Sequence, residues 1–267
     1  MVQEVKDLIK ELKHFRNTEY YKFLSLFRNA LYQNYFSKHV VYHCGPPSHK
    51  SLIKCIGQFR HYYRRFLPSN KDAAILEIGC GKGEFLYYLR QEGYQNILGI
   101  DLSSEQIAVA ENLTLPVQNI DCVHFLENDQ RQWDLIVARH LVEHFSKIEA
   151  LYLTYLIYER LNSGGRIIIE VPNCTTLLPS GSYTDLTHDT YFNEISVAQL
   201  LRIVDFANVE VFEMGPYIHG LKSLVRTVLW KVIKAFLRGY LIIYTAKTGR
   251  VVLTDGMIVT GRKAERS

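Results

Sequence analysis

The sequence predicts an α/β fold: a doubly wound, mostly parallel seven-stranded sheet with helices on both of its faces. Two observations predict it. Short runs rich in Ile, Leu and Val alternate with helical stretches from residue 73 onward, as expected for a parallel sheet covered by helices. A turn with three closely spaced glycines follows the first run directly, at the place where such sheets bind their ligands.

The alternation is regular enough to assign each element in turn. "AAILEI" is a buried strand, and "EFLYYLRQEGY" is the helix after the glycines. "NILGID" precedes "SSEQIAVAENL", a helix with a serine at its start. "WDLIVA" precedes a long helical stretch that reaches Leu161, and "SVAQLLRIVDF" (196–206) is a further helix. The expected strands lie within 73–78, 96–101, 115–121, 133–138, 163–173, 209–214 and 256–264.

The length of 267 residues fits one large domain with appendages. We expect a helical N-terminal arm or cap at 1–58 and the core at 59–215. A basic helical insertion at 216–250 and the last strand with the tail at 251–267 would complete the chain. The N-terminal helices are rich in Tyr and Phe, and they either cap the site or form the dimerising arm of a homodimer.

The composition favours a cytoplasmic protein. No signal peptide is visible, and no apolar run is long enough to span a bilayer. The cysteines are scattered and form no CxxC pair, which favours reduced thiols over disulfides or a structural zinc. These residues are Cys44, Cys55, Cys80, Cys122 and Cys174.

Charge is distributed unevenly along the chain. Residues 1–70 carry 12 basic and 4 acidic side chains, whereas residues 71–213 carry 9 basic and 21 acidic ones. Residues 214–254 carry 7 basic side chains and no acid. The basic flanks are either solvated helix faces or surfaces that meet an anionic partner.

The glycine turn in "ILEIGCGKGEF" (75–85) excludes two common phosphate-binding motifs. GxxxxGK[ST] has no match, and the third glycine comes one residue too early for GxGxxG. Glu77 would repel a pyrophosphate but suits an ammonium or sulfonium group. Asp101 and Asp121 end the next two strands, where carboxylates can accept ribose hydroxyls and an adenine amino group. A ligand with a cation, a ribose and an adenine but no phosphate is S-adenosylmethionine.

These segments resemble the class I S-adenosylmethionine-dependent methyltransferases over roughly residues 60–215 and the last strand. The resemblance rests on "LEIGCGKGEF", "GIDLS", "NIDCVHFL", "WDLIVARHLVEHF" and "LNSGGRIIIEVPN". It implies the Rossmann-like methyltransferase fold with S-adenosylmethionine as cofactor. The cofactor-binding residues that it implies are Glu77, Gly79, Cys80, Gly81, Gly83, Arg139 and His140 near the methionine part, Asp101 and Leu102 near the ribose, and Asp121 and Cys122 around the adenine.

"HLVEH" (140–144) also fits the H-x-x-E-H pattern of zinc proteases, with His140 and His144 one helical turn apart. Its place after a buried strand argues against zinc, because similar methyltransferases commonly have Leu-x-Glu-His there. We therefore expect no metal. His144 is either a satisfied helix histidine or a substrate contact.

The segment "YTDLTHDTYFN" (183–193) is the expected acceptor loop. It looks like the Asp-x-Thr-His stretch of methyltransferases that act on lipopolysaccharide, capsule or other glycans. A hydroxyl acceptor benefits from a base, and a neutral histidine is suitable. We predict His188 as that base, with Asp185 orienting it or binding the acceptor. The alternatives are that both residues only brace the loop, or that they help to bind a metal.

Residues 221–240 predict a basic amphipathic helix. Lys222, Arg226, Lys231, Lys234 and Arg238 fall on one half of it. Leu221, Leu224, Val225, Val228, Leu229, Val232 and Phe236 fall on the other. Such a helix either lies in a membrane interface or packs its apolar side on the domain or on a second subunit.

Taken together, the sequence predicts an O-methyltransferase of a glycan or another small polar acceptor. The alternative is an N- or carboxyl-methyltransferase of a small metabolite. RNA methylation is disfavoured, because neither an NPPY-type motif nor a cysteine-nucleophile motif follows the fourth or fifth strand, where "ARHL" and "VPNC" stand. A scaffold without activity is disfavoured by the intact glycine turn and by His188.

Overall fold

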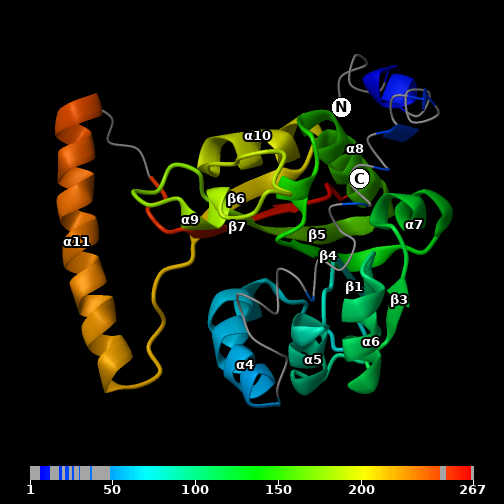
Figure 1. The fold of residues 1–267 in the computed structure, drawn as a ribbon, viewed down its shortest axis with the longest axis horizontal. Coiled ribbons are helices and arrows are strands. Elements are labelled where there is room, and N and C mark those ends of the chain that lie inside the picture. The colour runs from blue at the N-terminus through cyan, green and yellow to red at the C-terminus, as the bar shows by residue number, and fades with distance from the viewer. Residues whose placement is uncertain are drawn as a thin grey trace.

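The computed structural model describes residues 7–12, 18–19, 22–23, 26, 30, 37, 49–246 and 251–265. Its centre is a seven-stranded sheet with the order β3-β2-β1-β4-β5-β7-β6 (Figure 1). Strand β7 runs antiparallel to β5 and β6, and the other pairs are parallel. The predicted doubly wound fold is confirmed. The strands are β1 Ile75–Ile78, β2 Ile97–Asp101, β3 Val117–Asn119, β4 Trp133–Arg139, β5 Leu161–Pro172, β6 Ala207–Glu213 and β7 Gly256–Arg262.

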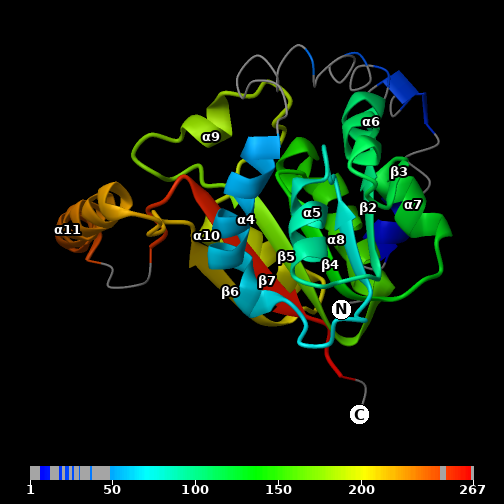
Figure 2. The ribbon, with the colours of Figure 1, turned by 90° about the horizontal axis from the view of Figure 1, so that it is seen from below.

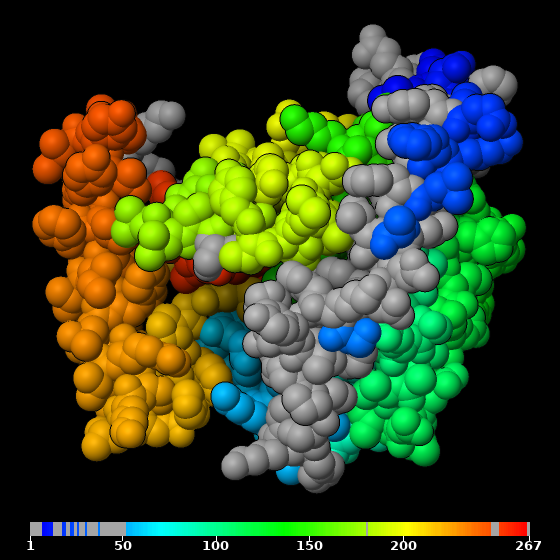
Figure 3. Space-filling view, in the orientation of Figure 1, coloured from blue at the N-terminus to red at the C-terminus, as the bar shows by residue number. Residues whose placement is uncertain are grey.

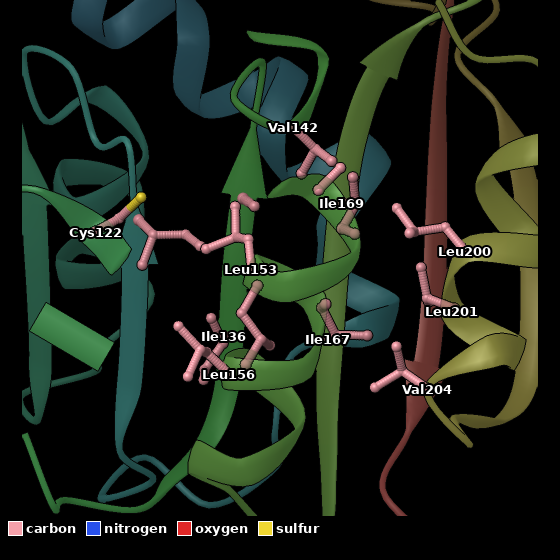
Figure 4. Packing of buried hydrophobic residues seen from close by; sticks show 14 of the residues in the cluster. Cys122, Ile136, Val142, Leu153, Leu156, Ile167, Ile169, Leu200, Leu201 and Val204 are labelled. Carbon is pink, nitrogen blue, oxygen red and sulfur yellow. The ribbon is translucent and has the colours of Figure 1, made fainter. Parts of the chain in front are cut away.

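Helices cover both faces of the sheet (Figure 2). One face carries α4 (His49–Tyr63), α5 (Glu84–Gln91) and α6 (Ser104–Asn112), which pack around Phe85, Leu86 and Leu89. The other face carries α7 (Cys122–Asn128), α8 (Lys147–Arg160) and α10 (Glu194–Ile203). Figure 4 shows this second core, in which Leu153 and Leu156 of α8 meet Ile136 and Ile167 of the sheet.

The strand order reverses beside β1, and this reversal positions the site. β1 lies between β2 and β4, and all four of its residues are buried. Chain segments that leave the carboxyl ends of β1 and β2 turn in one direction along the sheet, and those that leave β4 and β5 turn in the other. Open α/β sheets bind their ligands at such a switch point.

The predicted continuous helix from the fourth strand to Leu161 is wrong. β4 is followed by a short 3-10 helix, η3 (Val142–His144), and α8 begins only at Lys147. Ser146 and Glu149 form a capping box that starts α8 there, which satisfies two backbone N–H groups reciprocally. Leu161 belongs to β5. The segment at 140–146 is therefore a loop with a single 3-10 turn above the sheet rather than the start of an α-helix.

The predicted N-terminal arm at 1–58 lies mostly outside the described residues. Its last part belongs to α4, which runs across the predicted boundary at residue 58 and packs on α5. Between α4 and β1 comes η2 (Arg64–Phe66). The division of the chain into these segments stays a prediction.

The basic segment forms α11 (Leu221–Thr245), a helix that stands beside the domain (Figure 1). Of the three alternatives for its apolar side, packing on the domain is wrong, because Val232 and Phe236 are 65% and 75% exposed. The narrow stripe that faces the domain is mixed: it contains the half-buried Trp230 and Leu237, and on it Lys234 donates a hydrogen bond to Glu213. Among the described residues, no helix is both long and apolar enough to cross a membrane.

Candidate active site

The glycine turn joins β1 to α5. Gly79, Gly81 and Gly83 all have positive φ angles, of 68°, 53° and 78°, a conformation that other residues rarely adopt. Space is limited as well, because a Cβ on Gly83 would lie 2.5 Å from Leu115 Cδ1. The turn therefore needs glycine for two independent reasons. It leaves bare backbone at the carboxyl end of β1, where a ligand can lie against it.

Asp101 at the end of β2 holds this turn in place. Its Oδ2 accepts a hydrogen bond of 2.8 Å from Gly81 N, and its Oδ1 accepts one of 2.8 Å from Ser103 N. Burial raises the pKa of the Asp101 carboxyl, although these hydrogen bonds oppose the rise. A carboxylate oxygen has more than one acceptor site, so Asp101 can hold the turn and still accept ribose hydroxyls.

Glu77 lies one strand residue before the turn and is 1% exposed. Its Oε1 is 3.7 Å from Arg139 Nη1, and its buried Oε2 has no hydrogen-bond partner among the described residues. Burial raises the pKa of Glu77 to about 8, against the opposing effect of Arg139. A buried acceptor without a partner is costly. A cationic ammonium placed beside Glu77 would satisfy it.

A buried charge network lies next to Glu77. Arg139 and Glu170 are paired residues of β4 and β5, and Arg139 Nε donates a 2.7 Å hydrogen bond to Glu170 Oε2. The Tyr63 hydroxyl donates to the same oxygen. Burial alone would raise the pKa of Glu170, but Arg139 and His140 outweigh it and hold that pKa well below its usual range.

His140 closes the network toward solvent. Its Nε2 lies 3.3 Å from Glu170 Oε1, and its Nδ1 lies 3.4 Å from Glu143 Oε1. Burial acts to lower the pKa of the imidazole, but the two carboxylates reverse that effect and raise it. The side chain is 53% exposed. His140 therefore presents a positive charge at the edge of the site.

The acceptor loop packs on η3 through its backbone. Asp189 N and Thr190 N both donate hydrogen bonds to the carbonyl oxygen of Glu143, at 2.8 and 3.0 Å. Thr190 Oγ1 donates to the carbonyl oxygen of Phe145 at 2.7 Å. These contacts bring the His188 ring to a T-shaped contact with His144, with 4.7 Å between the ring centroids.

Hydrogen bonds orient both histidine rings. His188 Nδ1 lies 3.0 Å from the carbonyl oxygen of Ser182, and a carbonyl only accepts, so Nδ1 carries the proton and Nε2 of the neutral ring is basic. Thr187 Oγ1 donates to Asp185 Oδ1 at 2.6 Å and lies 2.9 Å from His144 Nδ1. Asp185 thus acts on His144 through Thr187. Burial lowers the pKa of His144, which favours its neutral form.

The described residues contain one group that could hold a metal ion: Glu143, His144 and His188 offer ligand atoms within 4.8 Å of one another. His140 of the zinc-protease pattern is not part of it. His140 has a positive φ of 48° and lies before η3 rather than one helical turn from His144. The H-x-x-E-H pattern is therefore not formed as a helical zinc motif.

The remaining predicted cofactor residues lie at the same edge of the sheet. Asp121 caps α7 by accepting a 2.8 Å hydrogen bond from His124 N, Cys122 is buried at the start of that helix, and Leu102 is 50% exposed after β2. Cys80 lies inside the glycine turn, and its N–H donates to the carbonyl oxygen of Ile100 at 3.0 Å.

Sequence analysis did not single out three polar residues that the structure places at the site. Tyr63 and Glu170 complete the buried network, and Thr187 links Asp185 to His144. Glu170 could have been recognised as a candidate, because it is an acid inside the apolar run "RIIIEVP". Tyr63 could not have been recognised, because it belongs to α4 and is 107 residues away from Glu170 in the sequence.

Comparison with known proteins identifies the family. The methyltransferase domain family matches residues 54–211. This match covers more than half of the chain, and the chain belongs to that family. Its fold is that of the class I S-adenosylmethionine-dependent methyltransferases. The predicted family and cofactor are thereby confirmed at the level of the family.

Two curated proteins are similar over part of the chain. Phosphoethanolamine N-methyltransferase 1 of Arabidopsis thaliana is 24% identical over 146 residues, which cover 51% of this chain and 29% of that protein. An uncharacterized methyltransferase of Alkaliphilus oremlandii is 28% identical over 104 residues, which cover 39% of this chain and 47% of that protein. The chain thus matches less than half the length of each of these relatives.

Solved structures share the fold. A SAM-dependent methyltransferase from Archaeoglobus fulgidus has a TM-score of 0.61 and 23% identity, and the match covers 79% of this chain and 94% of that one. Haemonchus contortus phosphoethanolamine N-methyltransferase 2, solved with phosphomonomethylethanolamine and S-adenosylhomocysteine, has a TM-score of 0.60 and 17% identity, with coverages of 88% and 60%. A plantazolicin methyltransferase solved with SAH has a TM-score of 0.54 and 18% identity, with coverages of 98% and 100%.

Binding of S-adenosylmethionine should release a proton at pH 7. With a pKa of about 8, most Glu77 carboxyl groups are protonated at that pH, and a neighbouring ammonium lowers the pKa. The affinity should therefore rise with pH up to about 8, where the α-amino group of the cofactor begins to lose its own proton. Calorimetry in phosphate and in Tris buffer measures the release. Equal binding enthalpies in the two buffers, or the same release from Glu77→Gln, would contradict the role of Glu77.

Proposed function

We propose that the protein transfers the methyl group of S-adenosylmethionine to a hydroxyl group of a sugar or of another small polar acceptor, in the biosynthesis of a lipopolysaccharide, capsule or similar glycan. The observation that carries this proposal is the histidine pair. His188 has its Nδ1 proton directed to the carbonyl oxygen of Ser182, which leaves Nε2 as a base. A hydroxyl is the acceptor that most needs a base, because its proton must leave as the new bond forms.

The step balances with these groups alone. The acceptor oxygen attacks the methyl carbon, the carbon–sulfur bond breaks, and S-adenosylhomocysteine leaves as a neutral thioether. The hydroxyl proton passes to His188 Nε2. The donor is already activated, so the enzyme mainly positions the acceptor and excludes water. In this proposal, Gly79, Gly81 and Gly83 with Glu77 and Asp101 hold the cofactor.

N-methylation of a small amine is the second candidate. Two of the similar proteins are named phosphoethanolamine N-methyltransferases. The positive charge of His140 at the edge of the site would suit an acceptor that carries a phosphate. An amine acceptor that is protonated at neutral pH also has a proton to lose, and the same histidine pair would take it.

An acceptor screen tests the proposal. The full-length protein is incubated with S-adenosylmethionine labelled in the methyl group, and with nucleotide sugars, polysaccharide precursors, phosphoethanolamine or RNA. We expect label in a sugar hydroxyl, stable to base as an ether is. Label on phosphoethanolamine nitrogen alone would favour the second candidate, and label in RNA alone would contradict both. A homodimer and a cytoplasmic location stay predictions.

A further inference from the structure

Helix α11 is amphipathic, but its broad apolar side faces away from the domain. It stands along one edge of the molecule, where Figure 3 shows it as an outer column. Ser223 on the domain-facing stripe is buried, and Lys234 and Arg238 on the same stripe reach Glu213. Trp230 lies against Gly215. A surface helix normally turns its apolar side to the core, yet here the least exposed stripe mixes polar residues with Trp230 and Leu237, and the broad apolar side faces outward.

The outer side of α11 is apolar and exposed along its whole length. At about 100° per residue, these side chains fall on one broad face opposite Ser223. Monomeric proteins rarely expose a contiguous apolar face of this size without a partner for it. The residues, with their exposed fractions, are Leu221 77%, Val225 52%, Val228 51%, Leu229 57%, Val232 65%, Phe236 75%, Tyr240 56% and Ile243 87%.

Positive charges border this apolar face on both sides. Lys222 and Arg226 lie along one border, and Lys231 lies along the other. No acidic residue occurs between 214 and 254. A second copy of the helix would bring the same cations opposite each other without any acid to pair them. An anionic surface, in contrast, complements both the cations and the apolar face.

We propose that α11 docks its outer face on an anionic membrane surface. The apolar side chains would lie among the acyl chains near the head groups, and the bordering cations would meet the head-group phosphates. The helix does not cross the membrane in this arrangement. Its domain-facing stripe remains bound to the domain, so the whole enzyme is held at the surface.

The return segment after α11 contacts the segment that leads from β5 into the acceptor loop. Asn173 Nδ2 donates hydrogen bonds to the carbonyl oxygens of Val252 and Thr254, at 2.9 and 3.1 Å. Gly181 N lies 3.3 Å from both carboxylate oxygens of Asp255. The same loop region exposes three leucines, Leu177 71%, Leu178 81% and Leu186 86%. Membrane docking would hold the enzyme at the lipid surface, and the acceptor that follows, which rests on the proposed function, is a polar group carried by a membrane lipid.

Vesicle flotation tests the docking itself. The probes are vesicles of equal parts phosphatidylcholine and phosphatidylglycerol, and vesicles of phosphatidylcholine alone. We expect binding to the anionic vesicles at low salt, and weaker binding as salt rises. Lys222→Glu/Lys231→Glu should weaken it at least about 25-fold, because each cation near the surface accounts for roughly five-fold. Val232→Glu/Phe236→Glu should abolish it.

Matched variants control for charge and for folding. Lys147→Glu on α8 and Ile195→Glu on α10 change exposed residues outside α11 and should bind vesicles as the wild type does. Activity on a short soluble acceptor should stay unchanged in all four variants, because none of the changed residues lies in the site. Methylation of the same acceptor group on a lipid in vesicles should fall only in the α11 variants.

Two results would overturn the inference. One is a wild-type protein that ignores anionic vesicles at low salt. The other is a stable dimer in light scattering that Val232→Glu/Phe236→Glu converts to a monomer, which would assign the face to a second copy of the chain. Vesicle binding without any methylation would instead contradict the proposed function and leave the docking intact.

Discussion

Replacing Arg139 with methionine should lower the free energy of unfolding by about 3–5 kcal/mol, the usual effect of removing one partner from a buried ion pair. The guanidinium lies 2.7 Å from Glu170 and 3.7 Å from Glu77, and its carbon Cζ lies 4.5 Å from the centre of the Phe59 ring. Without it, the buried Glu170 carboxylate loses a cationic partner. Urea denaturation monitored by circular dichroism measures the loss.

The double variant Arg139→Met/Glu170→Gln provides the control. It removes the pair rather than one partner, so it should recover part of the lost stability. The stability of the double variant should also fall less as the pH is lowered, because it lacks the Glu170 carboxyl, whose pKa is low in the folded wild type. A single variant that loses less than about 1 kcal/mol, as an exposed ion pair would, would contradict a buried network.

His188→Ala should lower turnover by roughly 100-fold or more, the usual contribution of a general base. Cofactor affinity should change little, because His188 belongs to the acceptor loop rather than to the glycine turn. Steady-state kinetics on the acceptor found in the screen, together with calorimetry of S-adenosylmethionine binding, separate the two effects. His219→Ala, at an exposed histidine before α11, should behave as the wild type does.

Three outcomes would change this assignment. Full turnover of His188→Ala would mean that His188 only stabilises the conformation of the acceptor loop. Loss of turnover in His144→Ala but not in His188→Ala would move the base to the partner ring, which Asp185 orients through Thr187. Loss of wild-type turnover with a chelator, restored by a divalent metal, would make Glu143, His144 and His188 metal ligands.

The sheet could be predicted from sequence because its strands are short apolar runs with clear ends. β1 and β4 each begin or end within two residues of the predicted bounds, and the glycines fix the first turn. The long helix before β5 could not be predicted correctly, because "RHLVEHFSKIEA" continues the helical pattern through η3. Only the capping box at Ser146 marks where α8 begins.

The cofactor side of the site was more predictable than the acceptor side. Asp101 and the glycines are close in the sequence and follow a recognisable pattern. The contacts of the acceptor loop with η3 join residues more than 40 positions apart, such as Glu143 and Asp189, and no local pattern records them. Helix α11 was predicted as a helix, but its pattern alone could not show that the apolar side faces outward.

Calorimetric titration with S-adenosylmethionine, of the wild type and of Asp101→Ala, tests most directly whether the glycine turn and the end of β2 form the cofactor site. Asp101 holds Gly81 N at 2.8 Å, and its loss would also leave the ribose hydroxyls unpaired. We predict that the wild type binds S-adenosylmethionine and that Asp101→Ala loses about 1–3 kcal/mol of binding free energy. The control Glu111→Ala, which changes an exposed acid on α6, should keep the melting temperature of the wild type. No binding to the wild type, or the same affinity in Asp101→Ala, would contradict the account.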